Sequence, residues 1–213
     1  MKPIAALLLA LLAFPAFASD FTKLVDGVIT TYGGAAAWKK VKAIHESGDV
    51  DAIGGHATMT RTWESARKLR VEIVYPDRTE VRDLDGDRGT RNGKAVMGPP
   101  LDGMTLQWAR MAIPALLVER REQLRDLGTR EGLRLIEIPL NDFLTITAAI
   151  DPKTFHIVRS ASKGTGGGQT IEFVTEYSDL RKSDGLLIAF GEENFAQGTR
   201  TATTKLTAAH VER

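Results

Sequence analysis

The stretch Lys68-Leu69-Arg70-Val71-Glu72-Ile73-Val74-Tyr75 sets the period of this fold. Apolar side chains occupy every second position, at Leu69, Val71, Ile73 and Tyr75. Because successive side chains of a strand point to opposite faces, the alternation is typical of a sheet with one buried and one solvated face. We therefore predict that these four residues face the interior and that Arg70 and Glu72 face solvent.

Turn-forming sequences recur along most of the chain and separate further strand-like runs. Examples are Pro76-Asp77-Arg78, Asp85-Gly86-Asp87, Asp151-Pro152-Lys153-Thr154 and Ser183-Asp184-Gly185. Spacings of roughly 8 to 12 residues between such turns are typical of a meandering antiparallel sheet. Parallel strands would require a helix at each crossover, and the sequence contains too few helical segments for that. We predict an α+β protein with about eleven strands in one large curved antiparallel sheet.

Two segments show helical spacing instead. The first begins at Asp20, a plausible N-cap, and repeats apolar residues up to Ile29. The second is an insertion between Leu101 and Leu127 whose apolar stripe runs from Met104 to Val118. Pro114 cannot donate a hydrogen bond inside a helix, so we expect it to divide the insertion into two helices packed on one face of the sheet.

The beginning of the chain resembles a signal peptide. Met1-Lys2 supplies a positive start, Ile4 to Phe17 is an apolar run, and Ala16-Phe17-Ala18 has the pattern that a signal peptidase cleaves. We expect cleavage after Ala18, although an uncleaved membrane anchor remains the alternative. The exported product would be one domain, residues 19–213, in a bacterial periplasm. No cysteine is present, so its core must hold it together without disulfides.

Charge and motifs narrow the functional classes. The 213-residue chain has 28 basic and 27 acidic residues, and removing Lys2 with the signal peptide leaves 27 of each. Such a neutral chain lacks the basic surface typical of nucleic-acid binders. Its four histidines show no metal-ligand spacing, and no G-x-S-x-G motif or thiol nucleophile occurs. We expect no catalytic residue, metal or cofactor, and therefore a protein that is not an enzyme.

Met104, Trp108 and Met111 in the insertion admit two interpretations. Methionine adapts to varied apolar shapes and is favoured on surfaces that accept loosely specified ligands. The residues could equally pack as ordinary core. On the first interpretation, the segment from Met104 to Leu117 forms a cover that meets an apolar ligand.

The order of several motifs resembles the periplasmic lipoprotein-carrier superfamily, which includes LolA and LolB. The similarity covers nearly all of the expected mature chain, approximately residues 21–211. Its motifs are Tyr32-Gly33-Gly34 with Trp38, Lys68 to Glu72, Asp85-Gly86, Ile150 to Thr154, and Tyr177 to Arg181 with Asp184-Gly185-Leu186. The chain departs from the pattern at Asp87-Arg88-Gly89-Thr90, where a tryptophan often follows the hairpin, and at Ile188-Ala189-Phe190, where a proline often stands.

The resemblance implies a strongly curved half-barrel whose concave face is covered by helices and holds an apolar ligand. It further implies a carrier for lipoprotein acyl chains or lipid, with a role in outer-membrane lipoprotein sorting. We expect the carrier to be a monomer. The alternative is an envelope sensor of the same fold that binds another protein. The expected ligand-binding residues, in the sheet and in the cover, are Leu69, Val71, Ile73, Tyr75, Met104, Trp108, Met111 and Leu117.

Overall fold

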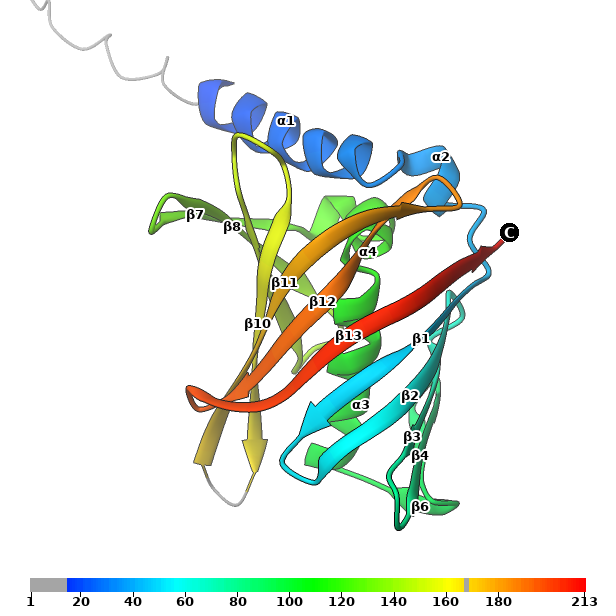
Figure 1. Ribbon diagram of the computed structural model, residues 1–213. Helices are drawn as coiled ribbons and strands as arrows, with labels where there is room; N and C mark the ends of the chain where they lie inside the picture. The colour runs from blue at the N-terminus through cyan, green and yellow to red at the C-terminus, as the bar shows by residue number, and fades with distance from the viewer. Residues whose placement is uncertain (1–14, 167–168) are drawn as a thin grey trace, which may run out of the picture.

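The computed structural model describes residues 15–166 and 169–213 and consists of one curved antiparallel sheet wrapped around a helical pair (Figure 1). The helices are α1 (Pro15–Thr31), α2 (Ala35–Trp38), α3 (Pro99–Met111) and α4 (Ile113–Glu119), followed by a 3₁₀ turn, η1 (Arg121–Gln123). The first six strands are β1 (Ala43–Ala52), β2 (Gly55–Glu64), β3 (Lys68–Val74), β4 (Thr79–Asp85), β5 (Arg88–Arg91) and β6 (Lys94–Val96). The remaining strands are β7 (Arg125–Arg130), β8 (Leu133–Pro139), β9 (Thr145–Ile150), β10 (Ile157–Gly166), β11 (Gln169–Ser183), β12 (Leu186–Ala196) and β13 (Thr199–Glu212).

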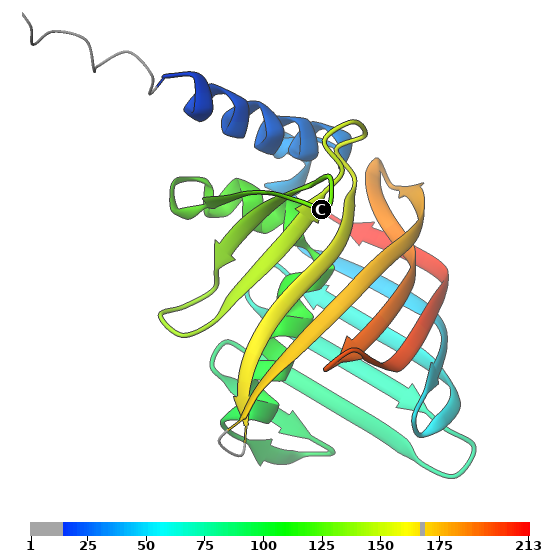
Figure 2. The ribbon, with the colours of Figure 1, turned by 90° about the vertical axis from the view of Figure 1, so that its left-hand side faces the viewer.

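The sheet confirms the predicted antiparallel meander, with thirteen strands rather than about eleven. Their order is β6-β5-β4-β3-β2-β1-β13-β12-β11-β10-β9-β8-β7, so the first and last strands pair in the middle. The two edge strands, β6 and β7, directly precede and follow the helical insertion. The chain therefore passes from one edge of the sheet to the other through α3 and α4, which places these helices within the curve of the sheet (Figure 2).

Two of the register shifts in the sheet are bulges on β13. Ser47 pairs with Ala208 and Gly48 with Leu206, so Thr207 is an extra residue, and its hydroxyl donates to the Ser47 carbonyl at 3.2 Å. The second shift lies between Asn194 and Phe195 of β12. Bulges bend a strand and increase its twist, which allows a long sheet to curl. Gly48 is required at the first bulge, because a Cβ there would lie 2.7 Å from the Leu206 Cα.

The predicted faces of β3 are confirmed. Leu69, Val71 and Ile73 are buried, and Arg70 is exposed. Glu72 is only half-buried, at the outer face beside Arg70. Tyr75 is also buried, but it follows the strand, which ends at Val74.

Helices α1 and α2 cover one end of the half-barrel (Figure 1). The predicted apolar stripe of α1 is buried at Leu24, Val25, Val28 and Ile29. The prediction of an N-cap at Asp20 is wrong for the described chain, in which α1 already begins at Pro15. Proline is favoured in the first turn because a helix leaves that N–H without a partner. The predicted signal peptide, residues 1–18, lies outside the described residues apart from residues 15–18, the first four of α1.

The insertion confirms the predicted division at Pro114 and corrects its end. Helix α3 stops at Met111, and Ala112 adopts a non-helical backbone before Ile113 and Pro114 open α4. The expectation that the insertion extends to Leu127 is wrong, because β7 already begins at Arg125. Among the described residues, no helix is both long enough and apolar enough to cross a membrane.

Candidate functional site

A hollow of about 400 Å³ lies between α3 and the concave face of the sheet. This volume falls within the roughly 300–1,000 Å³ range of small-ligand sites. Strands from both halves of the sheet and one helix contribute its walls. Its apolar lining includes Val50, Ala52, Met59, Ile73, Tyr75, Val96, Met104, Leu106 and Ile146.

Helix α3 forms the cover of this hollow. Gly103, Met104, Gln107 and Arg110 all line it, as expected for residues three and four apart on one helical face. The helix packs closely on β5 because Gly89 has no side chain: a Cβ there would lie 2.9 Å from both Leu101 Cδ1 and Met104 Sδ. Position 103, by contrast, is open, since a Cβ on Gly103 would meet no atom within 4 Å.

The part of the half-barrel nearer α1 is mostly packed core. The Trp108 ring stacks on Trp63 with centroids 5.9 Å apart, and its indole N–H donates to the Glu64 carbonyl at 2.9 Å. Helix α4 is almost fully buried, with Leu116 and Leu117 no more than 1% exposed. The segment predicted as a cover therefore divides into a part over the hollow and a part packed as core.

The structure brings together some of the residues that sequence analysis selected as ligand contacts. Ile73, Tyr75 and Met104 line the 400 Å³ hollow. Met111 lines a second, much smaller cavity of about 40 Å³ nearer α1. The remaining four line neither of these cavities and are buried in the core: Leu69, Val71, Trp108 and Leu117. A role in ligand binding stays a prediction for all eight.

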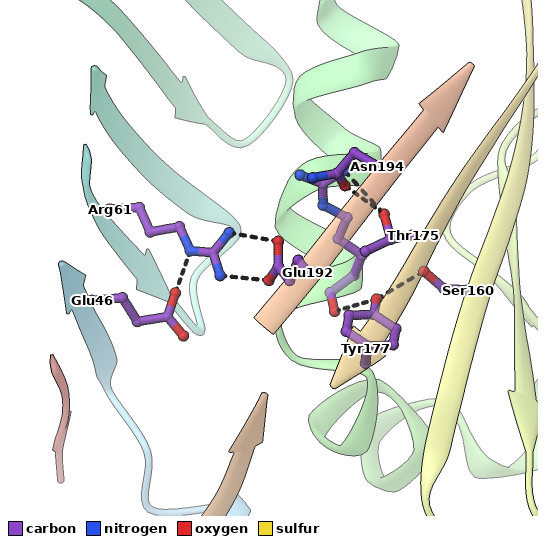
Figure 3. Close-up of polar contacts among 8 residues, drawn as sticks. Glu46, Arg61, Ser160, Thr175, Tyr177, Glu192 and Asn194 are labelled. Atoms are coloured by element: carbon purple, nitrogen blue, oxygen red, sulfur yellow. Dashed lines mark hydrogen bonds and ion pairs between the residues drawn. The ribbon is translucent and has the colours of Figure 1, made fainter. Parts of the chain in front are cut away.

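Glu46, Arg61 and Glu192 form a buried ion-pair triad (Figure 3). All three line the smaller cavity, and Arg61 also lines the hollow. Arg61 of β2 donates Nε to Glu46 of β1 and donates its two terminal nitrogens to Glu192 of β12. The two bonds to Glu192 measure 2.5 and 3.1 Å. All three side chains are less than 5% exposed, so each charge depends on the others for compensation.

Burial and pairing move the two carboxyl groups in opposite directions. Removal from water raises the pKa of Glu46, and the nearby Glu192 charge adds to this effect against the opposing pull of Arg61. Burial also acts to raise the pKa of Glu192, but the charges of Arg61 and Arg110 and the hydrogen bond from Arg61 outweigh it and hold that pKa below its usual value. Of the two carboxyl groups, Glu192 thus has the lower pKa.

Polar groups continue across the hollow from the triad (Figure 3). Arg110 of α3 donates to the Thr175 hydroxyl at 3.2 Å, and that hydroxyl donates to Asn194 Oδ1 at 2.8 Å. The Tyr177 hydroxyl donates to the Arg110 carbonyl at 3.1 Å and lies 2.8 Å from the Ser160 hydroxyl. Burial raises the pKa of Tyr177, which keeps it a neutral donor.

Sequence analysis missed this polar network, although a signal for it exists. In β2 the inward positions are Ala57, Met59, Arg61 and Trp63, so Arg61 interrupts an apolar face. Glu46 interrupts the inward face of β1 in the same way, between Ile44 and Val50. Charged residues at inward positions of an alternating strand predict a buried pair, because an unpaired buried charge is costly.

The described residues contain no group of three or more histidine, aspartate or glutamate side chains arranged to hold a metal ion. The hydrogen-bonded groups around Arg61 and Arg110 are suited to holding polar or charged atoms in place. The apolar walls beside them are suited to an aliphatic or aromatic group.

No protein-family model and no curated protein sequence matches the chain. Solved structures are similar. A LolA superfamily protein from Nitrosomonas europaea has a TM-score of 0.57 at 6% identity, covering 90% of this chain and 93% of its own. A domain assigned to outer membrane lipoprotein sorting, from Vibrio parahaemolyticus, has a TM-score of 0.55 at 8% identity, covering 89% of this chain and 91% of its own.

At identities this low the similarity is one of fold alone. It extends over about nine tenths of each chain. The chain has the fold of the LolA superfamily, as its sequence motifs predict.

Proposed function

We propose that the protein is a non-enzymatic carrier that holds the apolar part of a lipid or of a lipidated protein in the hollow beneath α3. The observation that carries this proposal is the hollow itself, with about 400 Å³ of space between α3 and the concave face of the sheet. The fold shared with a domain assigned to lipoprotein sorting supports the same class of ligand.

The physical basis is burial of apolar surface. Each methylene group transferred from water contributes about 0.8 kcal/mol, so ten would contribute roughly 8 kcal/mol before the costs of ordering. A net affinity in the micromolar range requires about 8 kcal/mol, so the ligand must bury more than ten methylene groups to offset those costs, and a preformed hollow keeps the costs low. Met104 suits such a wall because its flexible side chain adapts to the ligand.

We further propose that the carrier works as a monomer in the periplasm after cleavage behind Ala18. The signal-like sequence of Met1 to Ala18 supports export. Cleavage would leave Ser19 as the first residue and Asp20 near the start of a shortened α1, where an acidic residue favours the helix dipole. Sequencing the N-terminus of the exported product tests this part of the proposal.

Native mass spectrometry of the exported protein tests the carrier function. The expected spectrum contains a population of the mature chain with added mass, which organic extraction releases as lipid or as an acylated peptide. A protein that is always free of lipid, and that binds no added lipid, contradicts the proposal. If such a protein instead captured a defined envelope protein, the sensor function would replace it.

A further inference from the structure

The lining of the 400 Å³ hollow is strongly one-sided in charge. Four arginines reach it, Arg61, Arg82, Arg91 and Arg110, whereas no aspartate or glutamate of the described chain is among its lining residues. Glu46 and Glu192 line only the smaller cavity behind Arg61. A purely aliphatic ligand would bind poorly against these arginines, because it would displace water from cationic groups without offering them a hydrogen-bond partner.

Three of the four arginines are already paired. Arg61 is held by Glu46 and Glu192. Arg82 and Arg91 share one carboxylate, that of Glu80, at 2.5 and 2.8 Å. The last two side chains are 33% and 58% exposed, so they stand toward solvent.

Arg110 differs from the other three. Its hydrogen bond to a neighbouring side chain goes to the neutral Thr175 hydroxyl, and no described carboxylate lies within the 4.0 Å of an ion pair. Its Nε is buried and has no hydrogen-bond partner in the described chain. Burial lowers the pKa of Arg110; among its neighbours Glu192 and Tyr177 act to raise it, whereas the charges of Arg61 and Arg82 act to lower it. An anion placed here would give Arg110 a charged hydrogen-bond partner and would offset the repulsion from Arg61 and Arg82.

Apolar residues line the same hollow as this cationic group. Ile73, Met104 and Leu106 line the same hollow as Arg110. Arg110 also borders the smaller cavity beyond it, so its guanidinium group stands where the two spaces meet. One ligand can therefore contact the charge and the apolar walls together.

We propose that the hollow binds an amphiphile with an anionic head, a carboxylate or a phosphate, and that Arg110 anchors this head while the chain lies against the apolar walls. This rests on the proposed carrier function and specifies its ligand class. Arg110 is well placed as the anchor because a guanidinium group can donate two parallel hydrogen bonds to either head.

The test compares two probes with the same fluorescent chain, cis-parinaric acid and its methyl ester, on the full mature protein freed of lipid. The acid is expected to bind roughly tenfold or more tightly than the ester, since hydrogen bonds to charged groups are the stronger kind. Arg110→Met should remove this preference, and Arg110→Lys should retain part of it. Arg130→Met, which removes an exposed charge from the β7 strand, is the matched control and should keep the full preference.

A second arm separates the sources of the anion. Lysophosphatidic acid is expected to displace the probe, whereas inorganic phosphate or acetate at the same concentration is not.

Equal binding of the acid and the ester overturns the headgroup assignment and leaves the carrier function standing. Displacement by inorganic phosphate alone would show a small-anion site and overturn the amphiphile. Failure of both probes and of the lysolipid contradicts this inference and the carrier function together. If Arg110→Met does not fold, the test rests on the ratio of the affinities for the acid and the ester, measured in the wild-type protein and in Arg110→Lys. A ratio that is the same in both proteins overturns the role of Arg110.

Discussion

Arg61 of β2 and Glu192 of β12 form a two-point ion pair although 131 residues separate them in the sequence. The pair spans the centre of the sheet, where β1 and β13 join the two halves of the chain. It thereby holds the charged Arg61 at the wall of the hollow and links the two halves of the sheet. Removing one partner of such a buried pair leaves an uncompensated charge, which typically costs about 3–5 kcal/mol.

We predict that Glu192→Gln and Glu46→Gln respond oppositely to pH. The usual pKa of a glutamate is 4.5, and the pKa of Glu192 is lower. The Glu192 carboxylate therefore stabilises the fold at pH values above 4.5, and this contribution is lost as the pH falls below 4.5. The raised pKa of Glu46 means the reverse: its contribution is complete below 4.5 and is lost as pH rises above that value. Urea unfolding at pH 3.5, 5 and 7 should show Glu192→Gln most harmful at pH 7 and Glu46→Gln least harmful there. The same pH trend in both variants would contradict the assignment.

We predict that Val71→Asp destabilises the protein by about 3–5 kcal/mol, because it places an unpaired charge on a fully buried face. Glu72→Ala, the neighbouring position on the outer face, should change stability by about 1 kcal/mol or less, since its surface ion pair with Arg70 is weak. Chemical denaturation of the two variants measures both values. If Glu72→Ala were the more damaging change, the faces of β3 would be reversed.

We predict that Trp108 contributes to stability rather than to ligand contact. Its ring stacks on Trp63, and its indole N–H has a backbone partner, so Trp108→Ala should cost about 3–5 kcal/mol. Trp108→Phe should keep most of the packing and leave the affinity for a lipid probe within about twofold of wild type. A folded Trp108→Phe protein that no longer binds the probe would place this residue at the ligand instead.

The sequence predicted the fold well because the signals of the sheet are local. Alternation in Lys68 to Tyr75 and the turn residues between strands depend on neighbours in the chain, and Pro114 marks a helix boundary wherever it occurs. The count was short of thirteen because some strands are brief: β6 has three residues and no alternation to detect.

The site was less predictable because it depends on pairing across the sheet. Trp108 and Met104 share one apolar stripe in the sequence, yet one faces the core and the other faces the hollow. Nothing in the local pattern states that Arg61 meets Glu192, or that Arg110 has no carboxylate beside it. Those facts follow from the order of the strands, in which β1 and β13 lie between β2 and β12. The bulges on β13 also contribute, because they bend the sheet between these two strands.

The most direct test of the carrier function fills the hollow without disturbing the fold. Gly103 lines the hollow from α3 and has open space beside it. Gly103→Ala should stabilise the helix by about 1 kcal/mol and leave the affinity for cis-parinaric acid nearly unchanged. Gly103→Trp should remain folded and weaken binding of the probe at least tenfold, because the indole would occupy the ligand's space. Unchanged binding in a folded Gly103→Trp protein would contradict the hollow beneath α3 as the ligand site.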